Sequence, residues 1–527
     1  MVYAKHMVST QREPARKDQV QNNAGGYVWQ VSKWDVLQRF LILGAEGGTY
    51  YVKERNLTRE NASTIAECIE EDGKRVVNET VDVSVAGRAP RNTPALFVLA
   101  LCASFGGEEV RKYALSRLSE VARTGTHLFI FAEYVNTLRG WGRGLRSAIA
   151  SWYQDTPIHD LAYQAVKYKQ REGWSHRDLL RLSHPKTSDP NYSYLYRYML
   201  DGTINRSIVG VDEQLANYLE TIESLKTQQD VGRICDAIVN LNLPREVVPT
   251  EHLNNPRIWE ALLIRMPMTA MVRNLGNMSK VGLLTTGSAA AASIAKKLEN
   301  EQHLLGSRIH PMQVLVGMRT YQGGHGFRGS GTWEPVTKVV DALNNAFYVS
   351  FKNVKPTGKR LMLALDVSGS MSWSPAGMTI TSAEAVAAMA MITARVESDY
   401  VIMAFADVIR PLDISPTMRL DTVLRKTQDV NFGGTDCALP MRYAAAKKIP
   451  VDAFVVYTDN ETWAGPIHPF VSLRDYRSKM GINSKSIVVA TTATHFSIAD
   501  PNDKGMLDVV GFDTSVPQVM SQFISGE

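Results

Sequence analysis

Residues 361–370 read Leu-Met-Leu-Ala-Leu-Asp-Val-Ser-Gly-Ser, a short apolar run that ends in a polar loop. A run of this length, bounded by turn residues, predicts a buried strand. Similar runs predict strands at 400–406, 454–457 and 487–490, and helical patterns lie between them at 382–396, 436–448 and 472–479. Short buried strands that alternate with helices predict an α/β domain with a largely parallel sheet, which binds ligands at the carboxyl ends of its strands.

The chain from 93 to 351 differs, because helix follows helix there with short connections. The clearest helical patterns lie at 95–104, 108–122, 161–169, 176–182, 212–225, 257–275 and 311–320. No strict period is present, but irregular helical pairs are typical of a HEAT-like solenoid. The pattern changes at Lys355-Pro356-Thr357-Gly358. We therefore expect a flexible tail at 1–24, a helical domain at 25–354 and an α/β domain at 355–527.

The composition is that of a folded protein, with 44% apolar and 21% charged residues among 527. The longest mainly apolar runs, at 96–105 and 385–394, are too short to cross a bilayer. Residues 1–23 are polar and lack the apolar core of a secretory signal. The four cysteines are far apart, which favours reduced thiols over disulfides or a zinc site. These features predict a cytoplasmic protein with no membrane partner.

The charge is unevenly distributed along the chain. Residues 1–354 carry 42 Lys and Arg against 35 Asp and Glu, whereas residues 355–527 carry 16 against 18. A basic helical domain beside a mildly acidic α/β domain indicates a polyanionic partner. A basic face that is merely solvated remains the alternative on charge alone.

The loop after the first predicted strand contains Asp366, Ser368 and Ser370, whose side chains point the same way in an extended loop. Two more oxygen donors, Thr435 and Asp459, follow other predicted elements of the domain. A set of oxygen ligands with few charges suits Mg²⁺, with Mn²⁺ as the second choice. The set resembles the metal-ion-dependent adhesion site of von Willebrand factor A domains. The alternative is a vestigial loop that holds no cation.

The window 139–186 of the helical domain is rich in Lys and Arg, with Trp, Tyr and His between them. Arg177, Arg181 and His184 follow helical spacing, which predicts that they share one face of a helix. A cationic face with nearby aromatic rings can hold phosphates and stack bases. In the alternative interpretation, the rings are core and the charges are a solvated face.

The segment 167–184, Lys-Tyr-Lys-Gln-Arg-Glu-Gly-Trp-Ser-His-Arg-Asp-Leu-Leu-Arg-Leu-Ser-His, resembles the RNA-binding segment of the Ro ribonucleoprotein autoantigen family. Further stretches are similar to members of this family, at 26–31, 266–270, 273–276, 433–440, 454–464 and 499–514. The resemblance covers nearly the whole chain from about residue 25. The segments 189–205 and 281–294 match the vertebrate pattern poorly.

The resemblance implies a TROVE module, in which HEAT-like repeats form a ring that a von Willebrand factor A domain closes. It implies a noncatalytic, monomeric ring that binds Y RNA on its basic outer surface and single-stranded 3′ ends of misfolded noncoding RNA in its hole. Lys169, Arg171 and His184 match the family's RNA-contacting positions, and Arg177 and Arg181 extend them on the predicted helical face. An exoribonuclease such as polynucleotide phosphorylase is an implied partner through Y RNA. A eukaryotic member would be nuclear as well as cytoplasmic.

Two functions of other classes remain open at this point. The first is a protein-binding adaptor, in which a metal ion held by Asp366 and Asp459 coordinates a carboxylate of a partner protein. The second is a metal-dependent RNA nuclease. Two-metal hydrolysis needs several clustered carboxylates, whereas the predicted site has only two carboxylates among its five ligands. The nuclease is therefore the less favoured of the two.

Overall fold

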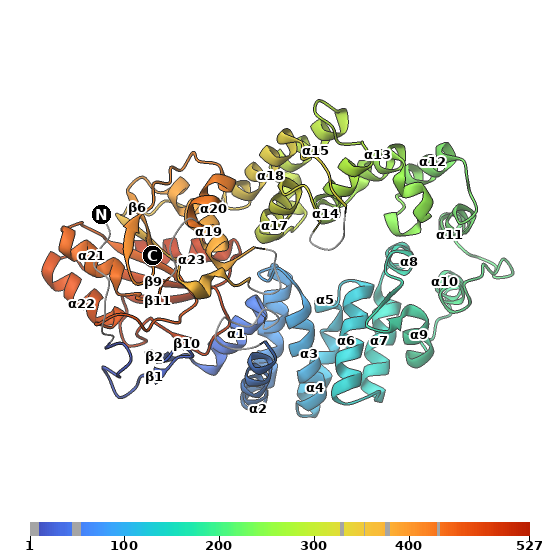
Figure 1. Cartoon of the computed structure of the whole chain (residues 1–527). Coiled ribbons are helices and arrows are strands. Elements are labelled where there is room, and N and C mark those ends of the chain that lie inside the picture. Colours follow the sequence, from blue (N-terminus) through green and yellow to red (C-terminus); the bar gives the residue numbers. More distant parts are fainter. Residues whose placement is uncertain are drawn as a thin grey trace.

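The computed structural model describes residues 10–44, 54–326, 331–352, 354–374, 380–428 and 433–526. Helices follow one another in an arc whose two ends both meet an α/β domain, so that the chain forms a ring (Figure 1). The helices of the arc are α1 (Lys33–Leu43), α2 (Glu54–Ala86), α3 (Thr93–Phe105), α4 (Glu108–Ser116), α5 (Leu118–Val121), α6 (Gly125–Leu138), α7 (Arg143–Asp155), α8 (Ile158–Lys167), α9 (His176–Ser183), α10 (Pro190–Asp201), α11 (Glu213–Leu225), α12 (Val231–Leu241), η1 (Arg245–Val247), η2 (Thr250–Asn254), α13 (Pro256–Arg265), α14 (Met268–Lys280), α15 (Ala289–Glu299), α16 (Glu301–Gly306), α17 (Pro311–Gln322) and α18 (Thr337–Val349). None of the described helices is long and apolar enough to cross a membrane.

One predicted helix of the arc is broken in the structure. The helical pattern at 257–275 is divided between α13 and α14, and Met266 between them has an extended backbone, with φ −63° and ψ 127°. The cause is Pro267, which has no N–H to donate and disfavours a helical conformation of the residue before it. The two helices pack against each other instead of forming one rod.

The α/β domain has a six-stranded sheet in the order β11-β9-β8-β5-β6-β7, which is parallel except at β7. Its elements are β5 (Leu361–Asp366), η3 (Gly369–Ser372), α19 (Ser382–Val396), β6 (Tyr400–Phe405), β7 (Ile409–Pro411), α20 (Leu420–Gln428), α21 (Leu439–Lys447), β8 (Ala453–Thr458), α22 (Pro469–Met480), β9 (Lys485–Ala490), β10 (Phe496–Ser497), β11 (Met506–Val510) and α23 (Ser515–Ser525). Together with the helical arc, this sheet confirms the predicted fold class.

The central strand β5 shows why its sequence is almost wholly apolar. Leu361, Leu363 and Leu365 belong to the core that contains α19. Met362 and Ala364 belong to a second core, formed with α21 and α22. Alternate side chains of a strand point to opposite faces of a sheet, so a strand with helices on both faces has no position for a polar residue before its end. The first polar side chain, Asp366, comes where the strand ends.

The N-terminal segment is not the flexible tail that its polar composition predicts. Residues 10–30, called the N-terminal strap below, lie along the α/β domain; residues 1–9 are outside the described part. The strap contains β1 (Val20–Gln21) and β2 (Tyr27–Gln30), and β2 pairs with β10. Gln11 is completely buried. Polar residues of the strap such as Gln11 and Asn22 are ordered because the α/β domain supplies their hydrogen-bond partners. Composition alone cannot show such partners.

Polar contacts close the ring on both sides of the α/β domain. Arg39 of α1 is buried and donates to the carbonyl oxygens of Thr494 (2.7 Å) and Phe496 (2.6 Å). On the other side, Arg319 of α17 pairs with Glu384 of α19 at 2.6 Å. Buried charges of this kind need a specific partner, so these contacts favour one closed arrangement of the two domains.

Candidate functional site

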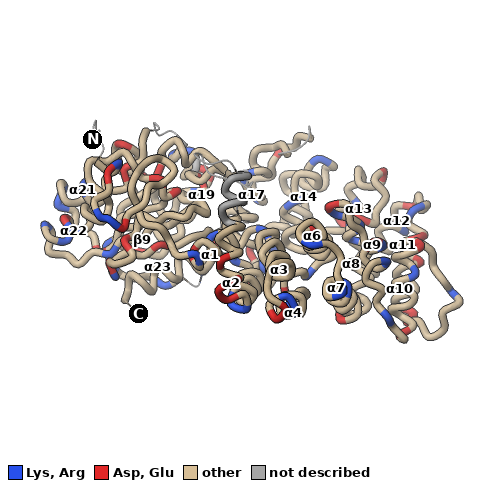
Figure 2. The backbone as a smooth tube through the Cα atoms, turned by 90° about the horizontal axis from the view of Figure 1, so that it is seen from below, with Lys and Arg blue, Asp and Glu red and all other residues tan. Residues whose placement is uncertain are grey.

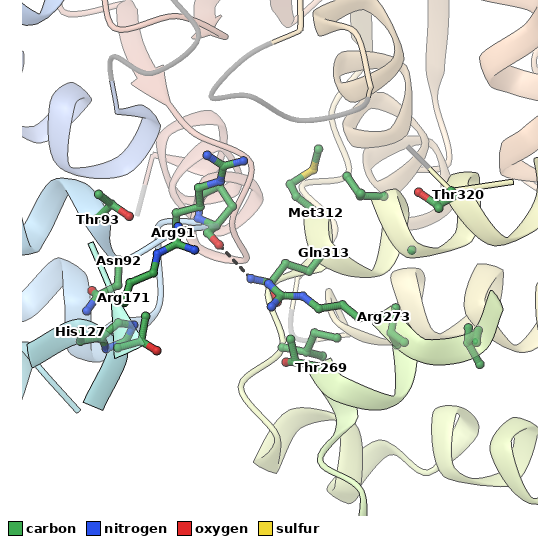
Figure 3. A pocket seen from close by; sticks show the side chains of 18 of the residues that line it. Arg91, Asn92, Thr93, His127, Arg171, Thr269, Arg273, Met312, Gln313 and Thr320 are labelled. Carbon is green, nitrogen blue, oxygen red and sulfur yellow. Dashed lines mark hydrogen bonds between the residues drawn. The ribbon is translucent and has the colours of Figure 1, made fainter. Parts of the chain in front are cut away.

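The ring encloses a cavity of about 1080 Å³. Its walls come from α3, α6 and β3 (Gln170–Arg171) on one side and from α14 and α17 on the other (Figure 3). The two walls meet where Gln313 of α17 donates to the carbonyl oxygen of Pro90 at 2.8 Å. The cavity is therefore a product of ring closure, because residues more than two hundred positions apart form it.

Among the described residues, three exposed arginines line this cavity: Arg91, Arg171 and Arg273. Figure 3 shows Arg171 and Arg273 extending into the space from opposite walls. Arg171 also pairs with its neighbour Glu172 at 3.0 Å. Trp333 adds an aromatic surface to the lining. Guanidinium groups and rings on facing walls can hold the phosphates and bases of a single strand.

A tight hairpin places Arg171 in the cavity. The strands β3 and β4 (Trp174–Ser175) pair antiparallel, and the turn between them has positive φ at Glu172 (52°) and Gly173 (81°). The indole nitrogen of Trp174 donates to Glu133 of α6 at 2.7 Å. This bond fastens the hairpin to the wall of the cavity. It also occupies Glu133, one of two carboxylates that line the cavity among the described residues.

The helix α9 follows the hairpin and carries the outer cationic residues. It begins with a capping box between Ser175 and Asp178. Arg177 and Arg181 are both exposed on the helix. His184 is exposed too, but it is the C-cap residue, with φ 49° and ψ 55° in the left-handed region. The prediction that His184 continues the helical face of the two arginines is therefore wrong, because the helix ends at Ser183.

Histidine His176, which lies among these cationic residues in the sequence, is buried. Its Nδ1 is 2.8 Å from the hydroxyl of Tyr153. A Cβ added at Gly125 would lie 2.9 Å from the Nε2 atom of His176, so α6 packs closely against the imidazole of this histidine. Burial lowers the pKa of His176 to about 4. His176 is a neutral core residue at neutral pH and not an RNA ligand.

The structure divides the five predicted RNA-binding residues between two surfaces. Arg171 lines the cavity, whereas Lys169, Arg177, Arg181 and His184 are exposed outside the cavity lining. Arg181 borders a shallow depression of about 440 Å³ beside Trp174. Figure 2 shows further Lys and Arg on α7, next to α9 in the arc.

Sequence reasoning missed two cavity residues, Arg91 and Arg273. Arg91 lies in the connection before α3, and Arg273 lies on α14. Neither belongs to the basic window at 139–186. Arg91 lies on the same wall of the cavity as Arg171, because α3 packs against α6 and α6 packs against β3, whereas only the closed ring brings Arg273 to face Arg171. The one available signal was that Arg273 lies within 273–276, a stretch that resembles the Ro family.

The five predicted metal ligands lie at the carboxyl ends of adjacent strands. Asp366 ends β5, and Asp459 follows β8, its neighbour in the sheet. Ser368 and Ser370 form the loop after β5, with their hydroxyl oxygens 3.1 Å apart. Thr435 belongs to a loop beside the end of β6, because the next residue donates its N–H to Ala406 at 3.0 Å. All five ligands are buried.

These side chains suit a cation. Burial and the neighbouring Asp459 carboxylate raise the pKa of Asp366 to about 7. The hydroxyl of Thr435 is buried and has no hydrogen-bond partner among the described residues. No cluster of three or more His, Cys, Asp and Glu suitable for a metal occurs in the part of the chain that the structure describes. A cation here would therefore be held by two carboxylates and by hydroxyls, as a hard ion such as Mg²⁺ permits.

Two family models match the chain. The TROVE domain model matches residues 20–224 and 240–320, and the Ro60 vWA domain model matches residues 360–524. The first match includes the end of the N-terminal strap and the whole of α9. The second spans every predicted metal ligand.

Curated proteins and a solved structure agree with these models. The chain is 43% identical to the RNA-binding protein RO60 of Deinococcus radiodurans over 522 residues, which is 98% of this chain and 97% of that protein. It is 36% identical to the RNA-binding protein RO60 of Caenorhabditis elegans, over 99% of this chain and 92% of that protein. The crystal structure of the D. radiodurans Ro (RSR) protein matches with a TM-score of 0.72 and 43% identity, over 94% of this chain and 100% of that chain. The chain therefore belongs to the Ro60 family, in which a TROVE domain is joined to a Ro60 vWA domain.

Proposed function

We propose that this protein binds RNA through two surfaces and takes part in the quality control of noncoding RNA. The observation that carries the proposal is the cavity, because Arg171 and Arg273 face each other there from walls that only the closed ring brings together. A single-stranded 3′ end can enter such a space, whereas a folded duplex is wider than one strand and is held outside. The cavity would thereby select misfolded RNAs that offer a free end.

The outer surface at α9 is the proposed site for a small structured RNA of the Y RNA kind. Lys169, Arg177, Arg181 and His184 are exposed, and they lie within sixteen residues of one another in and around α9. Proteins recognise RNA duplexes mainly through phosphates, 2′-hydroxyls and shape, which exposed cationic side chains can contact. A Y RNA bound here could also tether an exoribonuclease to the ring.

The protein acts without catalysis in this proposal. Two carboxylates occur among the described residues that line the cavity: Glu133 accepts the Trp174 N–H, and Glu172 pairs with Arg171. A metal-dependent nuclease needs carboxylates that hold metal ions at the RNA backbone. Asp366 and Asp459 are buried in the other domain, and none of the described residues that line the cavity belongs to the sheet. The adaptor function is not favoured, because the relatives are named for RNA binding.

We also propose that the Ro60 vWA domain holds Mg²⁺, or Mn²⁺ in its place. Asp366, Ser368, Ser370, Thr435 and Asp459 are the proposed ligands. The raised pKa of Asp366 has burial and Asp459 as its causes, and a divalent cation would offset both carboxylate charges. The unpaired Thr435 hydroxyl supplies a further oxygen. The bound cation would join the three loops at the end of the sheet.

A gel-shift titration tests the RNA proposal. The probes are a hairpin RNA with a single-stranded 3′ tail and the same hairpin with a blunt end, each at two salt concentrations. The proteins are the wild type, the outer-surface variant Lys169→Ala/His184→Ala, and Arg233→Ala as a control. Arg233 is an exposed arginine of α12 outside both surfaces, so its loss removes one charge without touching either site.

The wild type should bind both probes with salt-sensitive affinity, bind the tailed probe more tightly, and leave the RNA intact. The outer-surface variant should lose affinity for both probes, and Arg233→Ala should change little. No binding of either probe by the wild type at low salt would refute the RNA proposal. Cleavage of the probe in the presence of Mg²⁺ would refute the noncatalytic mechanism.

A further inference from the structure

Several polar contacts of the N-terminal strap are made with the loops that carry two of the proposed metal ligands, Thr435 and Asp459. We propose that the strap positions these loops and so controls the cation affinity of the Ro60 vWA domain, with Gln11 as the main positioning residue. This inference rests on the metal site proposed above. It gives residues 10–30, near the N-terminus, a role in a site of the C-terminal domain.

Gln11 connects the two loops directly. Its side-chain amide donates to Asp436 at 2.7 Å, and Asp436 immediately follows Thr435. Its side-chain oxygen accepts from the hydroxyl of Thr462 at 2.6 Å, three residues beyond Asp459. All atoms of Gln11 are buried, so these bonds form in a medium where an unpaired amide is costly. One strap residue thus spans the distance between the two ligand-bearing loops.

A second group of strap residues holds the loop after Asp459. The side chain of Asn23 donates to one oxygen of Glu461 at 2.7 Å, and the backbone N–H of Ala24 donates to the other at 3.2 Å. The side chain of Asn22 donates to the carbonyl oxygen of Thr462 at 2.9 Å. The strap therefore contacts successive residues of this loop, and it supplies the hydrogen bonds of a glutamate that is itself buried.

The two loops are also joined to each other at Thr435. The backbone N–H groups of Trp463 and Ala464 both donate to the carbonyl oxygen of Thr435, at 2.9 Å each. The hydroxyl of Thr435 has no hydrogen-bond partner of its own among the described residues, so its position depends on the loop backbone. Residues behind metal ligands set ligand orientation and affinity, and Gln11 occupies such a place for both loops.

The strap lies backbone to backbone against the loop after Asp459. A Cβ at Gly26 would lie 1.9 Å from the carbonyl oxygen of Thr462. Backbone this close to backbone requires glycine. Arg16 fastens the same strap elsewhere, at Asp500, with a contact of 2.6 Å. Arg16 therefore offers a matched control, because its partner belongs to neither ligand loop.

A titration of the full chain with Mn²⁺ tests the proposal. Binding is measured as the loss of the electron paramagnetic resonance signal of free Mn²⁺. The variants are Gln11→Met, which keeps the volume and removes the hydrogen bonds, and Arg16→Ala. Gln11→Met should weaken Mn²⁺ binding at least about tenfold, whereas Arg16→Ala should stay within about twofold of the wild type. Hydrogen exchange of the metal-free proteins should show faster exchange at 433–438 and 459–465 in Gln11→Met alone. Should Gln11→Met fail to fold, Asn23→Ala, at an exposed position, carries the same comparison.

Wild-type affinity in Gln11→Met would overturn the proposal, and so would an equal loss in Arg16→Ala, since that would indicate general loosening of the strap. A wild type that binds no Mn²⁺ would overturn it together with the metal site. Binding of the tailed hairpin RNA is measured on the same proteins and should be unchanged in Gln11→Met. A failure of the RNA proposal would appear in that assay alone.

Discussion

Replacing Arg171 and Arg273 together by alanine should abolish the preference for RNA with a single-stranded tail. The two side chains reach into the ring cavity from opposite walls and are the cationic groups best placed to hold the phosphates of one threaded strand. The outer surface at Lys169 and Arg181 is left intact. The variant should therefore bind the blunt hairpin as the wild type does, and lose only the additional affinity that the tail provides.

The size of the effect follows from the number of phosphate contacts. Each contact with a single strand contributes about 0.7 to the slope of log affinity against log salt. Two contacts contribute about 1.4, which between about 50 and 200 mM salt corresponds to about a sevenfold change in affinity. The ratio of tailed to blunt affinity should thus fall about sevenfold over this range in the wild type. In the double variant the ratio should be close to one at both salts.

Fluorescence anisotropy with labelled tailed and blunt hairpins measures this ratio directly. Arg233→Ala serves again as the charge control, and circular dichroism checks that the ring is folded. A double variant that keeps the wild-type ratio and its salt dependence would refute threading through the cavity. A double variant that loses affinity for both probes equally would show that the two arginines act on the outer RNA.

Three further predictions concern stability and the metal site. Burial lowers the pKa of His176 to about 4, so the unfolded chain binds the proton first; the stability from this residue is complete above about pH 6.5 and falls as the pH is lowered toward 4. The loss between pH 7 and pH 5 is about 2 kcal/mol, and urea denaturation should show that His176→Gln lacks this part of the pH dependence. Mg²⁺ at about a hundred times its Kd should stabilise the wild type by about 2.7 kcal/mol, and thermal melting with and without a chelator should show no such gain in Asp366→Ala. Gly26→Ala should destabilise the seat of the strap by about 1–3 kcal/mol, since the added methyl has no space against Thr462; limited proteolysis should then cut within residues 10–30, and an uncut strap would contradict the close approach.

Local patterns predicted much of the α/β domain correctly. The apolar run at 361–367 became β5, and the pattern at 382–396 became α19 with the same bounds. Burial between two helical layers imposes apolar residues on such strands, so the pattern is visible in the sequence itself. The polar residues that interrupt it, Asp366 and Asp459, therefore stood out as candidate ligands, and the structure places them at the ends of adjacent strands.

Helix ends were less predictable than helices. The sequence placed His184 on the face of Arg177 and Arg181, but the chain leaves the helix at Ser183 and turns into a left-handed conformation. A histidine carries only a weak local signal for such a turn, because most left-handed caps are glycine or asparagine. The three residues have helical spacing in the sequence, but His184 lies beyond the end of the helix and does not continue its face.

Local sequence was enough to indicate the two domains, the apolar cores of their elements and the residue types of both candidate sites, because each depends on neighbours along the chain. The places where the functional groups meet depend instead on the folded path of the chain. Arg273 faces Arg171 because ring closure brings distant helices together, and Gln11 reaches the metal loops from the far end of the sequence. Such contacts depend on the path of the whole chain, and no local pattern of charge or hydropathy encodes a hydrogen bond between residues 425 positions apart.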